Sequence, residues 1–122
     1  MDTRHMDRIL IKDLLIRCEI GVNPEERGIL QDVVLNLTMY ADQRAAAAAD
    51  DFALTVDYKS VKLAVISLVE NSSFRLIESL AAAVADLLLT VDGVVACEVS
   101  VDKPGALRFA RSVAVEIYRE RK

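Results

Sequence analysis

The stretch SVDKPGALRFARSV, residues 100–113, decides the fold because one strand ends in it and the next begins. Apolar and polar side chains alternate before it, and the apolar row consists of Val95, Cys97, Val99 and Val101. This alternation is typical of a strand with one buried face. The next residue on the buried parity is Lys103, so a core-facing apolar row ends on an ammonium. Pro104-Gly105 then predicts a turn.

Three more segments have the two-residue period of strands. Residues 8–20 place Ile9 and Ile11 on one parity, and a second apolar row follows on the other: Leu14, Ile16, Cys18 and Ile20. The slip at Asp13-Leu14 predicts a β-bulge. The second strand, in residues 30–41, alternates Val33, Leu35, Leu37 and Met39 with more polar neighbours, and the last strand carries Val113, Val115 and Ile117.

Helical spacing lies between the two pairs of strands. Asp57 predicts the cap of a helix whose apolar face holds Val61, Ala64, Val65 and Leu68. Ser73 predicts the cap of a second helix, with an apolar stripe of Ile77, Leu80, Ala81, Val84 and Leu88. Residues 42–51, DQRAAAAADD, are compatible with a short helix or an ordered excursion, and propensity favours a helical turn.

The predicted order is therefore ββααββ. It defines an α+β fold with a four-stranded antiparallel sheet and two helices on one face. Residues 7–120 are expected to form one domain after an N-terminal tail of residues 1–6. The second face of the sheet, where we expect Val34, Val94 and Ala114, and both sheet edges stay uncovered. Homo-oligomerisation is a hypothesis that follows from this geometry.

Composition narrows the class of protein. The chain has 122 residues, of which 53% are hydrophobic, and a net charge of −4. The charges are interspersed, so we predict no nucleic-acid or membrane partner. No apolar run reaches the length of a membrane span and no signal peptide is apparent, which predicts a cytoplasmic protein.

Cysteine and histidine usage argues against a metal. Cys18 and Cys97 lie on apolar parities of separate strands, which favours two buried free thiols in a reducing compartment over a disulfide. The one histidine, His5, lies in the tail. These three residues cannot form a standard zinc site, so we expect no metal and no cofactor.

Three single residues and one pair of glutamates are candidates for chemistry, and each also has a structural interpretation. Lys103 is either a strand-ending lysine that reaches water or a partly desolvated ammonium that exchanges protons near neutral pH. Glu78, in RLIESLA, is a first-turn glutamate or a carboxylate that accepts two hydrogen bonds from an amidine-like group. Tyr58 packs or relays a proton, and the pair Glu25 and Glu26, in the loop after Pro24, is a solvated charge pair or part of a site.

Four ordered motifs make the joint pattern specific: IGVNPEE (20–26), TVDYKSV (55–61), SFRLIESLA (73–81) and VSVDKPGALRFARSV (99–113). Together they resemble the dihydroneopterin aldolase family, and the resemblance extends from Asp7 to Arg119. It implies the tunnelling fold, in which four subunits join their sheets into a sixteen-stranded barrel and two rings usually stack into an octamer. It also implies active sites between neighbouring subunits.

The resemblance implies the roles of the site residues as well. The implied catalytic residues are Lys103, Tyr58 and Glu26, with Tyr58 supplied by a neighbouring subunit. The implied substrate-binding residues are Glu78, Glu26, Tyr58, Ile77 and Val56.

The implied reaction is metal-free cleavage of 7,8-dihydroneopterin into 6-hydroxymethyl-7,8-dihydropterin and glycolaldehyde, in folate biosynthesis. Two alternatives remain open at this point. One is a dihydroneopterin triphosphate 2′-epimerase, and the other is a non-catalytic pterin-binding protein on the same frame.

Overall fold

A computed structural model describes residues 2–122, so the first residue of the predicted tail lies outside the described part. The chain forms one four-stranded antiparallel sheet with the strands in sequence order. The strands are β1 (Arg8–Glu19), β2 (Leu30–Tyr40), β3 (Ala96–Pro104) and β4 (Ser112–Glu120). β1 and β4 are the two edges of this sheet.

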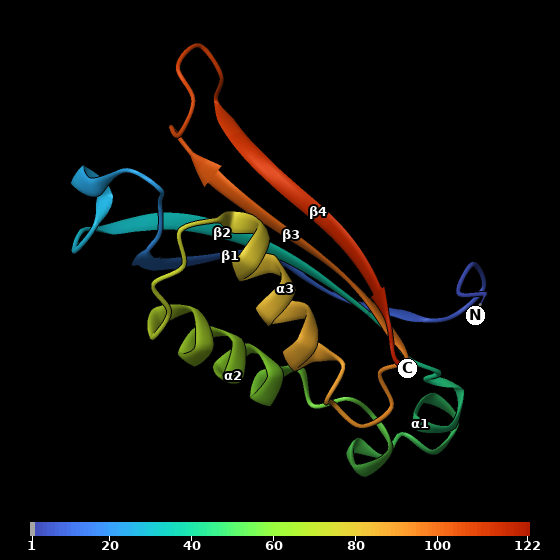
Figure 1. Cartoon of the computed structure of the whole chain (residues 1–122). Helices are drawn as coiled ribbons and strands as arrows, with labels where there is room; N and C mark the ends of the chain where they lie inside the picture. The colour runs from blue at the N-terminus through green and yellow to red at the C-terminus, as the bar shows by residue number, and fades with distance from the viewer. Residues whose placement is uncertain (1) are drawn as a thin grey trace.

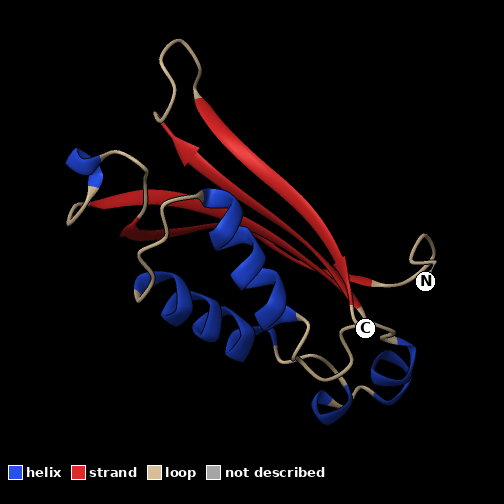
Figure 2. Cartoon of the chain, viewed as in Figure 1, coloured by secondary structure: helices blue, strands red, loops and turns tan. Residues whose placement is uncertain are grey.

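Two helices, α2 (Tyr58–Glu70) and α3 (Ile77–Leu88), lie against one face of the sheet (Figures 1 and 2). The predicted ββααββ order and α+β class are therefore confirmed. The connections hold three short elements: η1 (Pro24–Glu26) between β1 and β2, and α1 (Arg44–Ala49) and η2 (Phe52–Leu54) before α2.

The predicted bulge in β1 is present. The pairing register of β1 with β2 shifts between Ile11 and Leu14, and Asp13 has a positive φ of 53°. The Asp13 backbone N–H donates to Asn36 Oδ1 at 2.9 Å. Side chains alternate between the two faces of a strand, so two rows on opposite parities would normally face opposite sides. The bulge shifts this alternation by one residue, and both apolar rows of β1 therefore face the helices.

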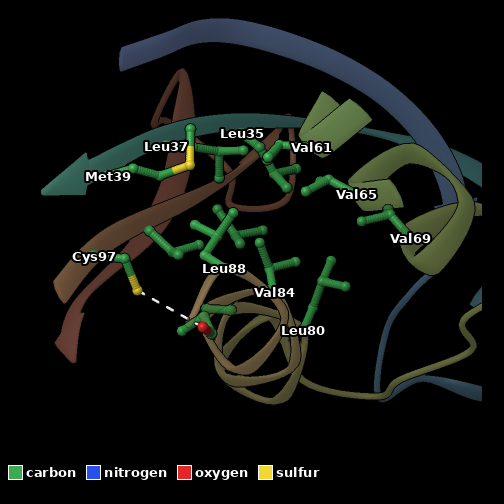
Figure 3. Packing of buried hydrophobic residues seen from close by; sticks show 14 of the residues in the cluster. Leu35, Leu37, Met39, Val61, Val65, Val69, Leu80, Val84, Leu88 and Cys97 are labelled. Atoms are coloured by element: carbon green, nitrogen blue, oxygen red, sulfur yellow. Dashed lines mark hydrogen bonds between the residues drawn. The ribbon is translucent and has the colours of Figure 1, made fainter. Parts of the chain in front are cut away.

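The core lies between the sheet and the two helices (Figure 3). It holds the predicted row of β2, most of the predicted row of β3 and the stripe of α3, including Leu35, Leu37, Met39, Val99, Val101, Leu80, Val84 and Leu88. Val95, predicted in the β3 row, is instead only partly buried, because it precedes the strand. The face of α2 differs from its prediction, because Ala64 is exposed and the buried residues are Val61, Val65 and Val69. Residues four apart occupy one face of a helix, so these three valines form the buried face of α2.

The start of α3 corrects a second expectation. Ser73 does not cap this helix, because the N-cap is Leu76, whose side chain makes no capping hydrogen bond. The cap of α2 is as predicted, with Asp57 accepting from the Ser60 backbone N–H at 3.1 Å. The carbonyls of Ser73 and Phe74 instead bond to the β1–β2 loop, and this cross-link requires an extended linker.

Val94 is the third correction. It is fully buried in the core rather than placed on the uncovered face. Strand parity does not apply to it, because it precedes β3 in the turn that follows α3. Val34 and Ala114 do follow the parity of the uncovered face, on which they are paired with Asp102 of β3.

Both cysteines are buried free thiols, as predicted. The Cys97 thiol donates to the Ala85 carbonyl at 3.7 Å, which ties β3 to α3 (dashed line in Figure 3). Burial raises the pKa of Cys97 to about 11 and also raises the pKa of Cys18. Within residues 2–122, no helix combines the length and apolar character needed to cross a bilayer.

Candidate active site

Lys103 ends the buried row of β3 and pairs with a carboxylate. Its side chain is 11% exposed, and its Nζ donates to Glu26 Oε1 at 2.6 Å. Glu26 comes from η1, 77 positions away in the sequence. The apolar row can therefore end on the ammonium of Lys103, because the carboxylate of Glu26 contacts it. The attraction between the two ions offsets the free energy that is lost when both are removed from water.

Three donors hold the Glu26 carboxylate. Besides the ammonium of Lys103, the Asn23 backbone N–H donates to Oε2 at 3.1 Å and Gln31 Nε2 donates to Oε1 at 3.4 Å. The Lys103 hydrogen bond, followed by the Asn23 hydrogen bond, lowers the pKa of Glu26 from 4.5 to about 2. Glu26 is thus an ionised, oriented acceptor at neutral pH.

Gly21 makes room for this carboxylate. Its φ is 142°, a conformation that L side chains rarely adopt, and a Cβ there would collide with the carboxyl oxygens of Glu26. The glycine of the IGVNPEE motif is therefore needed for both backbone geometry and close approach.

The pair opens onto a cavity of about 310 Å³ at one end of the sheet. Glu78 and Ile77, in the first turn of α3, line one wall of this cavity, and residues of the β1–β2 loop line another. The remaining lining residues are Gly21, Val22, Asn23, Arg75, Leu76, Ala106, Val113 and Val115. The structure thus brings together four of the predicted site residues, namely Glu26, Lys103, Glu78 and Ile77.

Tyr58 and Val56 do not reach this cavity. Tyr58 is 53% exposed and lines a different cavity of about 440 Å³, together with Phe52 and Thr55. Val56 is buried in the core just before α2. Figure 1 shows the start of α2 near α1, at the end of the molecule opposite η1. Within one molecule, Tyr58 and Val56 are therefore separated from the four predicted site residues that line the Lys103 cavity.

Sequence reasoning did not single out Gln31 or Arg75. Gln31 Nε2 bridges Glu26 Oε1 and the Ile20 carbonyl, which it reaches at 2.7 Å. A signal for Gln31 was present, because it lies on the buried parity of β2, as Lys103 does on β3. Arg75 also lines the cavity, from the linker before α3. It lies outside any helix or strand, so no periodic pattern could have predicted its position.

The geometry suits proton transfer on a planar ligand. An ammonium and an ionised carboxylate in contact can exchange protons with a hydroxyl, directly or through water. A second carboxylate, that of Glu78, can accept two parallel hydrogen bonds from an amidine-like edge.

The fold and the cavity define a small α+β protein whose ammonium and carboxylate groups, at one end of the sheet, are suited to acid–base chemistry. The sequence matches the dihydroneopterin aldolase (FolB) family over residues 9–118. The chain belongs to this family.

Curated relatives carry two names. A dihydroneopterin aldolase of Haemophilus influenzae is 39% identical over 93% of this chain and 97% of its own. A dihydroneopterin triphosphate 2′-epimerase of Pseudomonas aeruginosa is 38% identical over 92% of this chain and 91% of its own. The folic acid synthesis protein FOL1 of Dictyostelium discoideum is 40% identical over 93% of this chain, which spans only 17% of that protein.

Solved structures share the fold. The FolB protein of Vibrio cholerae has a TM-score of 0.92 and 40% identity, covering 95% of this chain and 98% of its own. An Escherichia coli dihydroneopterin aldolase in complex with neopterin has a TM-score of 0.89 and 37% identity, covering 93% and 99%. A Burkholderia dihydroneopterin aldolase bound to guanine has a TM-score of 0.83 and 27% identity, covering 98% and 95%.

Proposed function

We propose that this chain is a dihydroneopterin aldolase of folate biosynthesis, which cleaves 7,8-dihydroneopterin into 6-hydroxymethyl-7,8-dihydropterin and glycolaldehyde. The observation that carries the proposal is the 2.6 Å pair of Lys103 and Glu26 in a cavity that Glu78 also lines. Family membership over residues 9–118 supports the same activity.

Glu78 is proposed to bind the pterin ring. Its carboxylate accepts hydrogen bonds from the 2-amino group and from N3, which together form a planar donor pair. Guanine presents the same kind of edge; the Escherichia coli relative was solved in complex with neopterin and the Burkholderia relative bound to guanine. Ile77, beside Glu78 on the cavity wall, offers an apolar contact for the flat ring.

Lys103 and Glu26 are proposed to move protons at the side chain of the substrate. As the ammonium of Lys103 gives a proton to N5, its bound water takes the proton of the 2′-hydroxyl and passes it back to Lys103, and the C1′–C2′ bond breaks to release glycolaldehyde. The electron pair of that bond passes into the C6=N5 imine of the substrate, and N5 takes up a proton with the help of Lys103. Glu26 orients the lysine and the water, so the protein supplies position and protons rather than a covalent bond.

A tyrosine is proposed to finish the reaction. Protonation of C1′ in the enol intermediate, together with loss of the N5 proton, restores the imine and gives the hydroxymethyl product. Tyr58 is assigned this relay. Because Tyr58 lies away from the Lys103 cavity within one chain, it must come from a neighbouring copy. The proposal therefore includes a homo-oligomer, either a tetrameric ring or an octamer, in the cytoplasm.

The assay for glycolaldehyde tests this proposal. The wild type is expected to release glycolaldehyde and 6-hydroxymethyl-7,8-dihydropterin in equal amounts from 7,8-dihydroneopterin. Lys103→Ala should lower turnover by at least about 10²-fold, the lower range for one acid–base group. Lys62→Ala, at an exposed position of α2, is the matched control and should keep wild-type turnover. Unchanged turnover in Lys103→Ala would remove its catalytic role.

The second candidate is the 2′-epimerase, which the name of the Pseudomonas aeruginosa relative favours at 38% identity. Loss of the same hydroxyl proton, bond cleavage and re-addition on the opposite face would invert C2′. Incubation with dihydroneopterin triphosphate distinguishes the two. Inversion at C2′ with no glycolaldehyde from either substrate would favour the epimerase, and binding without reaction would favour a pterin-binding protein.

A further inference from the structure

Arg27 joins three segments of the chain through its guanidinium group. Nη1 donates to the Gly21 carbonyl at 3.1 Å and to the Phe74 carbonyl at 3.5 Å. Nη2 donates to the Ser73 carbonyl at 2.8 Å and forms an ion pair with Glu19 Oε1 at 2.7 Å. The arginine side chain is 33% exposed, so this network is partly shielded from water.

These contacts connect the two walls of the cavity. Arg27 directly follows Glu26, which belongs to the wall made by the β1–β2 loop. Its partners Ser73 and Phe74 lie in the linker that leads into the Glu78 wall. One backbone bond, from the Gly21 N–H to the Phe74 carbonyl at 3.3 Å, supports the same junction.

The linker between α2 and α3 is bonded locally at its α2 end, through Asn71 and Ser72. The α3 helix begins without a side-chain cap, since its N-cap is Leu76. Core packing of Leu80 and Ala81 fixes the helix on the sheet, but no side-chain cap supplies a restraint between its first turn and the Glu26 wall. The cross-link from Arg27 supplies this restraint from outside the helix.

The geometry requires arginine. A guanidinium is planar and offers five donors in a rigid fork, so it can serve backbone carbonyls from two segments and a carboxylate at once. A lysine ammonium keeps the charge but is a compact group without that fork, so it cannot span the same set of acceptors.

We propose that Arg27 is a positioning residue, which holds the Glu26 wall and the Glu78 wall of the cavity at a fixed separation. The proposal deepens the proposed function and rests on it, because a pterin held at Glu78 must present its side chain to Lys103 and Glu26. Small misplacements of reacting groups are costly, about 10²-fold for a shift near 1 Å.

Arg27→Lys tests the proposal, with Arg44→Lys as the matched control. Arg44 forms a similar ion pair with Asp42 at 2.7 Å, but it is 86% exposed and local. Arg27→Lys should lower kcat/KM for 7,8-dihydroneopterin by about 10- to 100-fold, and Arg44→Lys should leave it unchanged. Calorimetry with 6-hydroxymethyl-7,8-dihydropterin should show weaker binding in Arg27→Lys alone.

A double-mutant cycle separates positioning from a general loss of stability. If Arg27 acts by placing Glu78, then Arg27→Lys should weaken pterin binding much less in a Glu78→Gln background than in the wild type. Equal weakening in both backgrounds, at a temperature where all variants are folded, would overturn the positioning role.

Amide hydrogen exchange gives a readout that does not depend on the proposed function. The Gly21 amide, which bonds across the junction, should exchange at least about tenfold faster in Arg27→Lys and at the wild-type rate in Arg44→Lys. Unchanged exchange in Arg27→Lys would overturn the proposal. A wild type that binds no pterin would refute the proposed function, and the exchange rates would still decide whether Arg27 holds the walls together.

Discussion

At the scale of single residues, the candidate site contains one ion pair that is largely shielded from solvent. Lys103 and Glu26 have side chains that are 11% and 20% exposed, at a separation of 2.6 Å. Removing such charges from water costs free energy that their attraction must offset, and breaking the pair leaves an unpaired charge. The further donors from Asn23 and Gln31 therefore help to keep the carboxylate in place.

This pair predicts a specific dependence of stability on pH. The pKa of Glu26 is lowered from 4.5 to about 2 in the folded chain, chiefly by Lys103. A lowered pKa means that the ionised form stabilises the fold; the contribution is complete above pH 4.5 and is lost as pH falls toward 2. The free energy of unfolding of the wild type should therefore fall more steeply in this window than that of Glu26→Gln. Urea titrations at a series of pH values measure both slopes.

The neighbouring glutamate provides the control for that experiment. Glu25→Gln removes the same charge at an exposed position of η1 and should retain the wild-type slope. Parallel curves for the wild type and Glu26→Gln would contradict the assigned role of the ion pair.

Some site residues could be predicted from the sequence and others could not. Lys103 breaks an apolar row, and Glu78 borders an apolar stripe, so both leave a mark in the pattern of one segment. Arg27 leaves none, because its partners other than Glu19 are backbone carbonyls, up to 47 positions away. Every residue has a backbone carbonyl, so the residue types at these positions do not predict a hydrogen bond to Arg27.

At the scale of elements, periodicity predicted the strands better than the helix boundaries. The bulge near Asp13 and the buried rows of β2 and β3 follow from side-chain alternation alone. The start of α3 does not, because Ser73 is a good capping residue whose carbonyl is bonded to Arg27 instead. Here a tertiary contact overrides a local preference.

The β1–η1 loop carries a prediction of its own. Gly21→Ala adds a methyl group that collides with the Glu26 carboxylate at a φ of 142°. The carboxylate must move away from Lys103 or the loop must open, so turnover should fall at least about tenfold. The pH dependence of stability described above should also flatten. Gly93→Ala is the control for backbone strain, since its φ is 87° but no atom lies within 4 Å of the added group.

The two glycine variants separate strain from contact. Gly93→Ala should lower stability with wild-type turnover, because its turn lies before β3 and outside the cavity. Equal loss of turnover in both variants would show that backbone strain alone explains the effect of Gly21→Ala.

At the scale of the whole molecule, the residues of the proposed site fall into two groups that lie apart within one chain. Lys103 lines one cavity with residues of the β1–β2 loop, and Tyr58 lines a second cavity with residues of α1 and η2. The sheet also has two free edges, β1 and β4, and an uncovered face on which Leu15 is 60% exposed. A head-to-tail ring of copies would cover the edges and bring each Lys103 cavity to the Tyr58 of a neighbour.

Mixing two inactive variants tests this arrangement. Lys103→Ala lacks the proton-moving lysine, and Tyr58→Phe should not form the hydroxymethyl product. When the two proteins are refolded together in equal amounts, about a quarter of the sites in a random ring should combine an intact Lys103 with an intact Tyr58. Product formation should therefore return to about a quarter of the wild-type rate, although neither variant forms product alone. If Tyr58 served Lys103 of its own chain, every site would lack one group, and the mixture would stay as inactive as its components.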